Sequence, residues 1–415
     1  QVYRRNRDGA WILADDFKGW PIAPGDIPAP LICLKADYSD SSMTMNTGGA
    51  RLFDEMMRSL GLLTPPQRHD ARVRQAIDGF PVDVFSSESE EGSIEYYGQY
   101  NFNNDKSKSG DIFGHSNVKD FDTSKSVAIE FLNNGSHPGQ FQAAGSAEST
   151  ELLKQMQTEF DDAMEFNYPE DLTWATIDTK VPGAQKALLR LFGWIYDCVR
   201  ECTQKNGLDT AHTDYKDISR FKSEKFKAEL YQYFPIDHLL LYYLWTDYHM
   251  SVDQRVKNII MRTWDLQHWY MKYYDGDCAF GKRNDSFLSY LYTLSRDTWD
   301  ADKNKYAFEG HNSWLWCLVL ANFNEELRTM AKKMRSFLTN EKEFNMWNIK
   351  QMGNWCARAY NKSGAFKYIV PATKGVRVIK DGVTSEGVTY PYIYALDGTN
   401  HAHRVNIIKK RFSLL

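Results

Sequence analysis

Apolar positions in the first third of the chain come in short runs, which predict β-strands around a single helix. Residues 31–35 form an apolar run of strand length, and the four prolines before it favour an extended backbone. In residues 50–60 the apolar positions recur at helical spacing, and Gly61 is placed to end that helix. The acidic, serine-rich residues 86–92 are expected to be the solvated loop of a hairpin. Further strands are expected over residues 73–85, 94–102 and 127–132.

Beyond residue 149 the apolar positions follow a helical period, with charges on the opposite face. Helices are expected over residues 150–164, 184–205, 223–233, 236–248, 287–295, 313–337 and 341–360. Residues 258–261 and 269–274 are instead short apolar or aromatic runs on either side of a turn, which predicts a β-hairpin between helices. The tail, residues 366–404, has the pattern of irregular strands and turns.

A change in composition marks the expected domain boundary. Residues 136–149 are rich in Gly, Ala, Ser, Gln and Pro, which is typical of a connection between two lobes. We therefore expect an α+β protein with a small β-rich first lobe that contains one helix, and a larger, mainly helical second lobe. The expected ranges are 1–135 for the first lobe, 136–149 for the linker, 150–362 for the second lobe and 363–415 for a β-like extension.

The charge balance and the cysteines exclude several classes of protein. With 50 Lys and Arg against 54 Asp and Glu, a net charge of −4 and a pI near 6.2, the 415-residue chain has no overall positive field for nucleic acid. Its six cysteines form no Cys-x-x-Cys pair, so neither a disulfide framework nor a zinc knuckle is expected. The apolar stretch at residues 236–245 is shorter than the about 18 residues of a membrane span. The chain begins at Gln1 without a basic and apolar leader, so we expect no signal peptide and no membrane partner.

The candidate chemistry surrounds the predicted hairpin. Asp253 lies five residues before Asn258, and two further aspartates follow the second strand directly. Phosphoryl transfer from ATP needs a carboxylate that orients or deprotonates the attacking hydroxyl, and a carboxamide and a second carboxylate that hold Mg²⁺. The order matches the protein-kinase catalytic loop and the metal-binding Asp after it. We therefore expect Asp253 and Lys257 in catalytic roles, with Asp253 as the base. The expected metal ligands are Asn258, Asp275 and, as an additional one, Asp277.

Each of these patterns also has an ordinary explanation. An Asp and an Asn at this spacing arise often by chance, and Asp-Gly-Asp, at residues 275–277, is a common turn. Their joint occurrence at the two ends of one hairpin, after a long apolar helix, favours the functional interpretation.

The first lobe offers lysines for the nucleotide phosphates. Lys35 ends an apolar strand and precedes the predicted helix, an order that matches the kinase strand lysine and the helix carboxylate that positions it. Glu55 borders the apolar stripe of that helix and is the expected partner of Lys35, with Asp54 as its competitor. Lys106 ends another strand of the same lobe and is the alternative phosphate ligand. A solvated Lys35 and an exposed Glu55 without a function are the simpler interpretations of these two residues.

Four stretches of the chain together carry a family resemblance. They are residues 34–42 (LKADYSDSS) followed by Asn46-Thr47-Gly48, 97–106 (YGQYNFNNDK), 253–258 (DQRVKN) and 274–281 (YDGDCAFG). In these motifs the chain resembles the CotH kinase family, atypical protein-kinase-like phosphotransferases named after a bacterial spore-coat protein. The resemblance spans about residues 30–340. It implies a bilobal protein-kinase-like fold, ATP with Mg²⁺ or Mn²⁺ as cofactors, and transfer of phosphate to Ser or Thr hydroxyls of a protein substrate.

The resemblance also bears on location and partners. The forms of the motifs look closer to versions found in large tailed-phage proteins than to the spore-coat member. This implies a virion-associated protein, with other virion proteins as partners, or a protein of the bacterial cytoplasm. The second hypothesis is a structural phage-tail protein that keeps this fold as a scaffold with weak or no catalysis.

The chain departs from protein kinases at the loop that covers the phosphates, because no Gly-x-Gly-x-x-Gly precedes Lys35. Cover is therefore expected from residues 41–49, which include Asn46, through backbone N–H groups and hydroxyls. By analogy with a kinase hinge, the nucleotide base is expected near residues 127–134.

Other classes of site have less support. The histidines show no His-x-x-x-His spacing and Gly-x-Ser-x-Gly is absent, so imidazole metal binding and the usual esterase chemistry are not expected. The 12 Trp, 24 Tyr and 23 Phe would suit a carbohydrate-binding module only if they were arrayed on one exposed face, whereas by default they fill a core.

Overall fold

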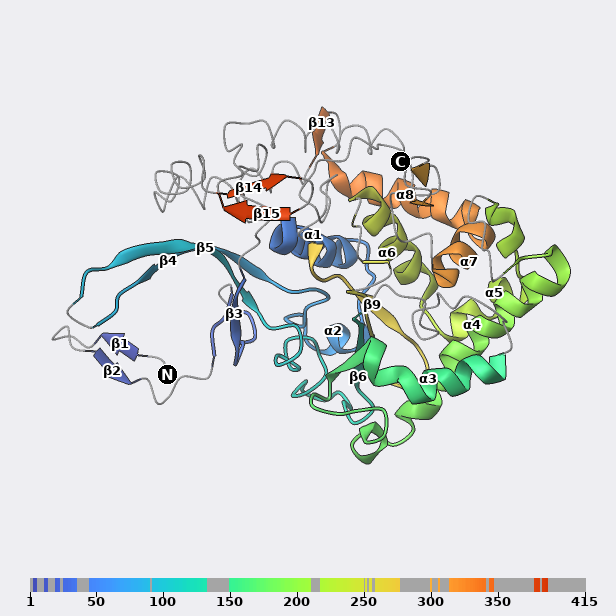
Figure 1. The fold of residues 1–415 in the computed structure, drawn as a ribbon, viewed down its shortest axis with the longest axis horizontal. Helices are drawn as coiled ribbons and strands as arrows, with labels where there is room; N and C mark the ends of the chain where they lie inside the picture. The colour runs from blue at the N-terminus through green and yellow to red at the C-terminus, as the bar shows by residue number, and fades with distance from the viewer. Residues whose placement is uncertain are drawn as a thin grey trace.

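The structure of the chain is a computed structural model with a mixed α+β fold (Figure 1). It describes residues 3–5, 11–13, 19–22, 25–35, 45–89, 92–132, 149–209, 217–249, 251, 254–255, 258–276, 299–300, 305–306, 313–340, 343–346, 377–380 and 383–386. The α+β class expected from the sequence is therefore confirmed.

The first sheet is antiparallel, in the order β3-β5-β4. Its strands are β3 (Ile32–Lys35), β4 (Gly79–Ser86) and β5 (Glu95–Asn104). The predicted hairpin of β4 and β5 is confirmed, and in Figure 1 it extends as a long ribbon away from the helices. Phe80 and Phe102 lie opposite each other on this hairpin, and their rings pack 5.5 Å apart.

The first sheet has a polar face, on which the side chain of Lys35, the last residue of β3, lies. Lys35 pairs with Asn101 of β5 in the register, and Leu34 pairs with Phe102. Because successive side chains of a strand point to opposite faces, Lys35 and Asn101 lie on the face opposite to Leu34 and Phe102. Thr47 Oγ1 of the neighbouring helix donates a hydrogen bond to Asn101 Oδ1 over 3.3 Å. The polar face is therefore the one turned toward that helix.

The second sheet is antiparallel, in the order β7-β6-β8-β9. Its strands are β6 (Val127–Phe131), β7 (Met164–Tyr168), β8 (Ile260–Thr263) and β9 (Tyr270–Lys272). The hairpin of β8 and β9 was expected from the sequence and is confirmed. Every residue of β6, β8 and β9 is buried, so this sheet runs through the core.

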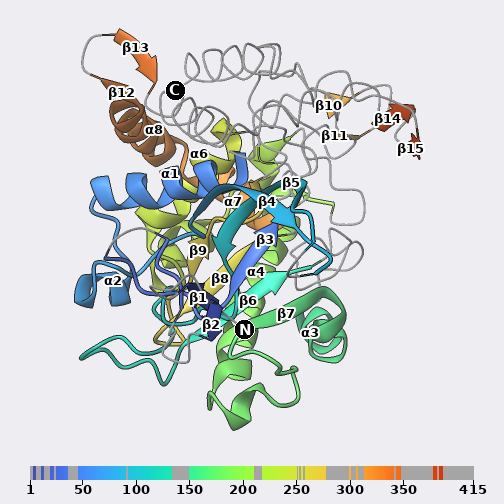
Figure 2. The ribbon, with the colours of Figure 1, turned by 90° about the vertical axis from the view of Figure 1, so that its left-hand side faces the viewer.

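Strand β6 links the two halves of the chain. It precedes the expected linker at residues 136–149, yet it lies between β7 and β8, which both follow that linker. Figure 2 shows the four strands in the middle of the molecule, with α3 (Ser149–Ala163) beside β7.

Helix α1 (Met45–Ser59) packs into the core of the second half. The fully buried Phe53 of α1 lies 5.9 Å from the ring of Tyr242 and 6.0 Å from that of Trp245, both on α6 (Ile236–Tyr248). Its ring is also 5.9 Å from that of Tyr273, which follows β9. A single hydrophobic cluster therefore contains residues from both sides of the expected linker.

The remaining helices largely follow the predicted pattern. They are α4 (Ala184–Asn206), α5 (Glu224–Glu229), α7 (Trp314–Asn322) and α8 (Asn324–Leu338), with the 3₁₀ turns η2 (Ile177–Thr179), η3 (Ile218–Phe221) and η4 (Leu230–Gln232). The helix expected over residues 313–337 is two helices, which are separated at Phe323. Within the described residues, every helix is too short or too polar to cross a lipid bilayer.

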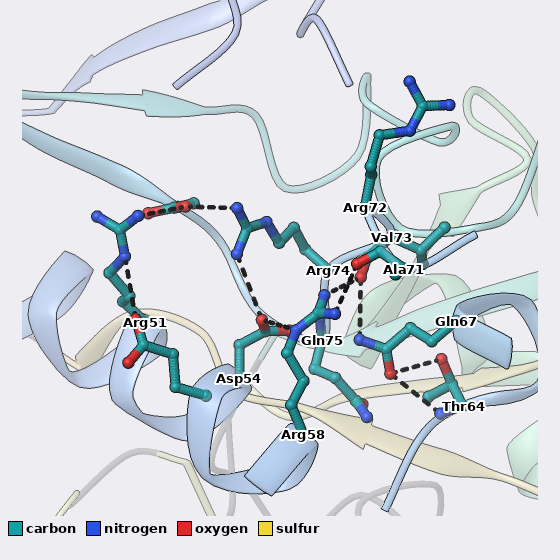
Figure 3. A network of polar contacts seen from close by, with 12 residues as sticks. Arg51, Asp54, Arg58, Thr64, Gln67, Ala71, Arg72, Val73, Arg74 and Gln75 are labelled. Carbon is teal, nitrogen blue, oxygen red and sulfur yellow. Dashed lines mark hydrogen bonds and ion pairs between the residues drawn. The ribbon is translucent and has the colours of Figure 1, made fainter. Parts of the chain in front are cut away.

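Two expectations about elements are wrong. The first 135 residues contain a second helix, α2 (Pro65–His69), which is too short to show a periodicity. Prolines at its first positions suit a helix start, and the Thr64 N–H donates to Gln67 Oε1 over 3.0 Å (Figure 3). Within the helix expected over residues 341–360, β13 (Glu343–Met346) pairs with β12 (Thr339–Asn340). The alternating polar and apolar residues of β13 suit a strand.

Short antiparallel pairs complete the described residues. They are β1 (Tyr3–Arg5) with β2 (Trp11–Leu13), β10 (Trp299–Asp300) with β11 (Lys305–Tyr306), and β14 (Arg377–Lys380) with β15 (Val383–Glu386). The last pair agrees with the strands expected in the tail. The helix expected over residues 287–295 lies outside the described residues.

Candidate functional site

The two ends of the β8–β9 hairpin bring Asn258 and Asp275 together. Asn258 Nδ2 donates a hydrogen bond to Asp275 Oδ2 over 2.8 Å. Both residues have a left-handed backbone, with φ of 54° and 59°. This conformation is uncommon outside glycine but is tolerated by Asn and Asp, so it orients both side chains from turns rather than from the strands. The convergence of these two side chains was expected from the sequence.

The backbone of β6 fixes the position of Asn258. The Asn258 N–H donates to the Phe131 carbonyl over 2.8 Å, and the Phe131 N–H donates to the Ile259 carbonyl over 2.9 Å. These bonds continue the β6–β8 ladder into the two residues before β8, because they use the same backbone groups that a strand uses.

Lys35 reaches the same carboxylate from the first sheet. Its Nζ forms an ion pair with Asp275 Oδ1, while Asn258 occupies Oδ2. The side chains of Lys35 and Asp275 are 30% and 22% exposed, so the pair is partly accessible to solvent. A lysine from a distant strand and an amide from the other end of the hairpin therefore meet at one carboxylate.

Gln254 supports the segment that carries Asp275 and was not singled out in the sequence. This buried side chain donates from Nε2 to the Tyr274 carbonyl over 2.9 Å and to the Asp275 carbonyl over 2.6 Å. It thus ties the residues before the hairpin to those after it. The only signal in the sequence is a polar residue inside the stretch between Asp253 and Asn258.

Three of the expected site residues lie outside the described part of the chain. They are Asp253, Lys257 and Asp277. Their roles as base, catalytic lysine and additional metal ligand remain predictions.

The ring of Tyr274 lies close to two lysines. Lys35 Nζ is 5.6 Å from the ring centre and Lys106 Nζ is 5.4 Å from it, both within the range of a cation–π contact. Burial raises the pKa of the Tyr274 hydroxyl to about 12, so the tyrosine is neutral at physiological pH. The aromatic ring therefore connects the two candidate phosphate lysines.

Lys106 is held by carboxylates. Its Nζ lies 2.5 Å from Glu130 Oε2 and 2.8 Å from Glu165 Oε1. Asn167 Nδ2 donates to the same Glu130 oxygen over 3.0 Å. Burial by itself lowers the pKa of Lys106, but the attraction of Glu130 and the hydrogen bonds to both glutamates outweigh it, so the pKa is raised. Lys106 is therefore a permanent cation of the site.

Neither glutamate was identified in the sequence, although Glu130 left a signal. It is the one charged residue of the strand sequence VAIEF, and a charge in a buried strand needs a partner. Glu165 lies on β7, which was not predicted as a strand.

A buried lysine fixes the backbone of Lys106. Lys272 Nζ donates to the Lys106 carbonyl over 2.8 Å and lies 3.0 Å from the centre of the Phe113 ring. Burial lowers the pKa of Lys272 well below its usual range. Lys272 therefore acts here as a hydrogen-bond donor inside the core.

Glu55 does not take the expected place beside Lys35. Its Oε1 lies 3.5 Å from Arg51 Nε, one turn earlier on α1, and Lys35 is paired with Asp275 instead. The spacing of four residues on one helix favours the Arg51 contact. The expectation that Glu55 positions Lys35 is thus corrected for this structure.

Asp54, the competitor of Glu55, belongs to a structural network (Figure 3). Its Oδ2 lies 2.7 Å from Arg58 Nε and 3.5 Å from Arg74 Nη1, and its Oδ1 accepts a hydrogen bond from the Gln75 N–H over 2.5 Å. This network attaches α1 to the segment before β4.

Asn46 lies at the start of α1 and is fully buried. The next residue, Thr47, donates to Asn101, which is the register partner of Lys35. The start of α1 is therefore fixed beside the end of β3. The expected phosphate cover by residues 41–49 remains a prediction, because residues 41–44 lie outside the described part of the chain.

The donor chemistry at Asn258 and Asp275 fits Mg²⁺ or Mn²⁺. Magnesium in nucleotide sites is usually held by one or two carboxylates, with phosphate and water oxygens as the other ligands. Asp275 would supply a carboxylate. Asn258 would supply its carbonyl oxygen Oδ1 after rotation of the side-chain amide, because its Nδ2 now points to Asp275. No group of three or more His, Cys, Asp or Glu side chains with metal-binding geometry occurs among the described residues.

Comparisons of the chain with protein-family models and with curated proteins find no match. The interpretation of the site therefore rests on its residues and their geometry.

Proposed function

We propose that the chain is a metal-dependent, kinase-like phosphotransferase, which moves the γ-phosphoryl group of ATP to a Ser or Thr hydroxyl of a protein. The observation that carries this proposal is that Lys35 and Asn258 both contact the Asp275 carboxylate. A cation from a strand, an amide and a carboxylate are the groups that hold a nucleotide and its metal in phosphoryl transfer.

The order of the elements supports a bilobal kinase-like arrangement. Lys35 comes from the small β3-β5-β4 sheet, while Asn258 and Asp275 come from the two ends of a hairpin in the helix-rich half. The motifs at residues 34–42 and 274–281 resemble those of the CotH kinase family in the same order. Their likeness to phage versions further favours a virion-associated enzyme.

Each residue has a defined task in this proposal. Lys35 binds phosphate oxygens, with Lys106 as the alternative phosphate ligand, and Asp253 orients the acceptor hydroxyl and accepts its proton. Asn258 and Asp275 hold the metal, with Asp277 as an additional ligand. When bound, the metal supplies neutralisation of the charge that develops on the phosphate groups.

The experiment is incorporation of radiolabelled γ-phosphate from ATP into a mixed protein substrate and into the chain itself. Asp275→Ala is expected to lower the rate by roughly a hundredfold or more, because metal stabilisation of the transferred group is worth several kcal/mol. Asp162→Ala, on the exposed face of α3, is the matched control and is expected to retain the wild-type rate. Thermal unfolding verifies that both variants are folded.

Two outcomes would contradict the proposal. Equal incorporation by wild type and Asp275→Ala would remove the enzyme assignment. Nucleotide binding without transfer, in the presence of Mg²⁺ or Mn²⁺, would instead favour the phage-tail scaffold.

A further inference from the structure

We infer that Lys35 is an internal counter-cation of the metal site, which neutralises Asp275 until a nucleotide draws the lysine away. This inference rests on the proposed function and adds a form of regulation to the same site. Its starting point is that both oxygens of the Asp275 carboxylate have a protein partner, Lys35 in an ion pair at Oδ1 and Asn258 in a hydrogen bond at Oδ2.

The resting contacts use the atoms that a metal needs. Lys35 Nζ is paired with Asp275 Oδ1, and Asn258 Nδ2 donates to Oδ2 over 2.8 Å. Asn258 therefore turns its N–H group, and not its carbonyl oxygen, toward the carboxylate. A divalent cation needs the carbonyl oxygen of the amide as its ligand, not the N–H group. It also repels an ammonium group at the same carboxylate. Metal binding and the Lys35 contact thus compete with each other.

The backbone that carries the carboxylate and the amide is fixed by hydrogen bonds. The backbone of Asp275 is held by Gln254, through hydrogen bonds to the carbonyls of Tyr274 and Asp275. Asn258 is held by the Phe131 carbonyl. The part that can move is the long, partly exposed side chain of Lys35, whose Nζ lies over the Tyr274 ring at 5.6 Å.

Lys106 cannot take over this task. Its ammonium is engaged by Glu130 and Glu165 at 2.5 and 2.8 Å. Lys35, by contrast, has Asp275 as its carboxylate partner and would exchange it for a phosphate oxygen. No covalent bond changes in this step, since one ion pair is replaced by another.

The exchange couples the two ligands of the site. A metal ion alone must displace Lys35 without giving the lysine a new partner, so it binds weakly. A metal ion that arrives with a nucleotide provides the phosphate that takes up Lys35, so it binds well. Such couplings between ligands typically amount to roughly 5- to 150-fold in affinity.

The test measures Mn²⁺ binding to the full chain by the electron paramagnetic resonance signal of free Mn²⁺, without turnover. Lys35→Met is expected to bind Mn²⁺ alone about tenfold more tightly than wild type, within the usual range of such couplings. The same variant is expected to bind the Mn²⁺ complex of a non-hydrolysable ATP analogue more weakly, because the phosphate contact is lost. A merely structural role of Lys35 would weaken both.

Two further variants separate charge from packing. Lys35→Arg keeps the cation and is expected to bind Mn²⁺ alone as weakly as wild type. Lys108→Met removes an exposed lysine that is paired with Glu170 at 3.6 Å, and is expected to match wild type in both measurements. Thermal unfolding of each variant controls for the fold.

The outcomes distinguish this inference from the proposed function. Mn²⁺ affinity that is unchanged or reduced in Lys35→Met overturns the counter-cation role, while Asp275-dependent phosphate transfer would still stand. Absence of Mn²⁺ binding in every variant, with and without the nucleotide analogue, overturns both proposals.

Discussion

At the scale of single residues, the site contains two charged groups, each of which has two polar or charged partners. Asp275 is shared by Lys35 and Asn258, and Lys106 is shared by two glutamates. Removing one partner of a buried pair leaves an uncompensated charge, which costs more than an exposed pair contributes. The two glutamates around Lys106 differ in this respect, because the side chain of Glu130 is 3% exposed and that of Glu165 is 42% exposed.

This difference leads to a prediction for stability. Glu130→Gln is expected to lower the free energy of unfolding by about 3 kcal/mol, because it removes a buried charge that compensates Lys106. Glu165→Gln, the matched control on β7, is expected to lower it by less than about 1 kcal/mol. Urea denaturation measures both values. Equal losses in the two variants would show that burial does not decide the strength of these contacts.

At the scale of elements, α1 and β6 position the site through different contacts. Helix α1 is held by its own Asp54 and Arg58 side chains, which contact Arg74 and backbone groups of residues 71–75 in the segment before β4. Its first residues are tied to β5 beside Lys35. Strand β6 holds Asn258 through backbone groups. The side chains around α1 are therefore the part of the support that single substitutions can remove.

Asp54 is the centre of the contacts that hold α1. It is 2% exposed and accepts hydrogen bonds from Arg58 and from the Gln75 N–H. Asp54→Ala leaves the buried Gln75 N–H without this acceptor and removes the buried carboxylate that Arg58 and Arg74 share, so it is expected to lower the free energy of unfolding by about 3 kcal/mol. Glu325→Ala removes the exposed pair with Arg328 on α8 and is expected to cost less than about 0.5 kcal/mol. A loss below about 1 kcal/mol for Asp54→Ala in urea denaturation would contradict this account.

At the scale of the whole molecule, the second sheet crosses the expected domain boundary. Strand β6 precedes the predicted linker and is the neighbour of both β7 and β8. Without β6, both of these strands would expose an edge of unpaired backbone groups in the core. The helix-rich half is therefore completed by residues from the first 135.

This arrangement predicts the behaviour of fragments. Residues 150–362 expressed alone are expected to lack a cooperative unfolding transition, because β6 and α1 are missing from their core. Residues 1–135 supplied in the same cells are expected to restore a folded complex. Circular dichroism during heating and size-exclusion chromatography test both statements. Cooperative unfolding of the isolated fragment would show instead that the boundary at residues 136–149 separates independent domains.

Local patterns in the sequence predicted what depends on neighbours in the chain. The β8–β9 hairpin could be expected because its two short apolar or aromatic runs and the turn between them lie within one short stretch. The pair at its two ends could be expected because the spacing of Asp253, Asn258 and Asp275 matches that of a kinase catalytic loop and its metal-binding Asp. The preference of Glu55 for Arg51 is also local, and the spacing of four residues was a usable signal.

Contacts between distant strands could not be predicted in this way. The pattern of β6 indicates a strand but not which strands become its neighbours, and nothing near Lys35 indicates Asp275 as its partner. These contacts depend on how the whole chain packs, and no local periodicity of the sequence reveals which distant segments become neighbours.

The hydrogen bonds between Phe131 and residues 258–259 use main-chain atoms alone. Neighbouring side chains can therefore drift during evolution, as long as they stay apolar, without shifting the amide away from its carboxylate partner. The arrangement of the strands can therefore persist after sequence identity is lost. Distant relatives would be recognised by structural superposition sooner than by sequence alignment.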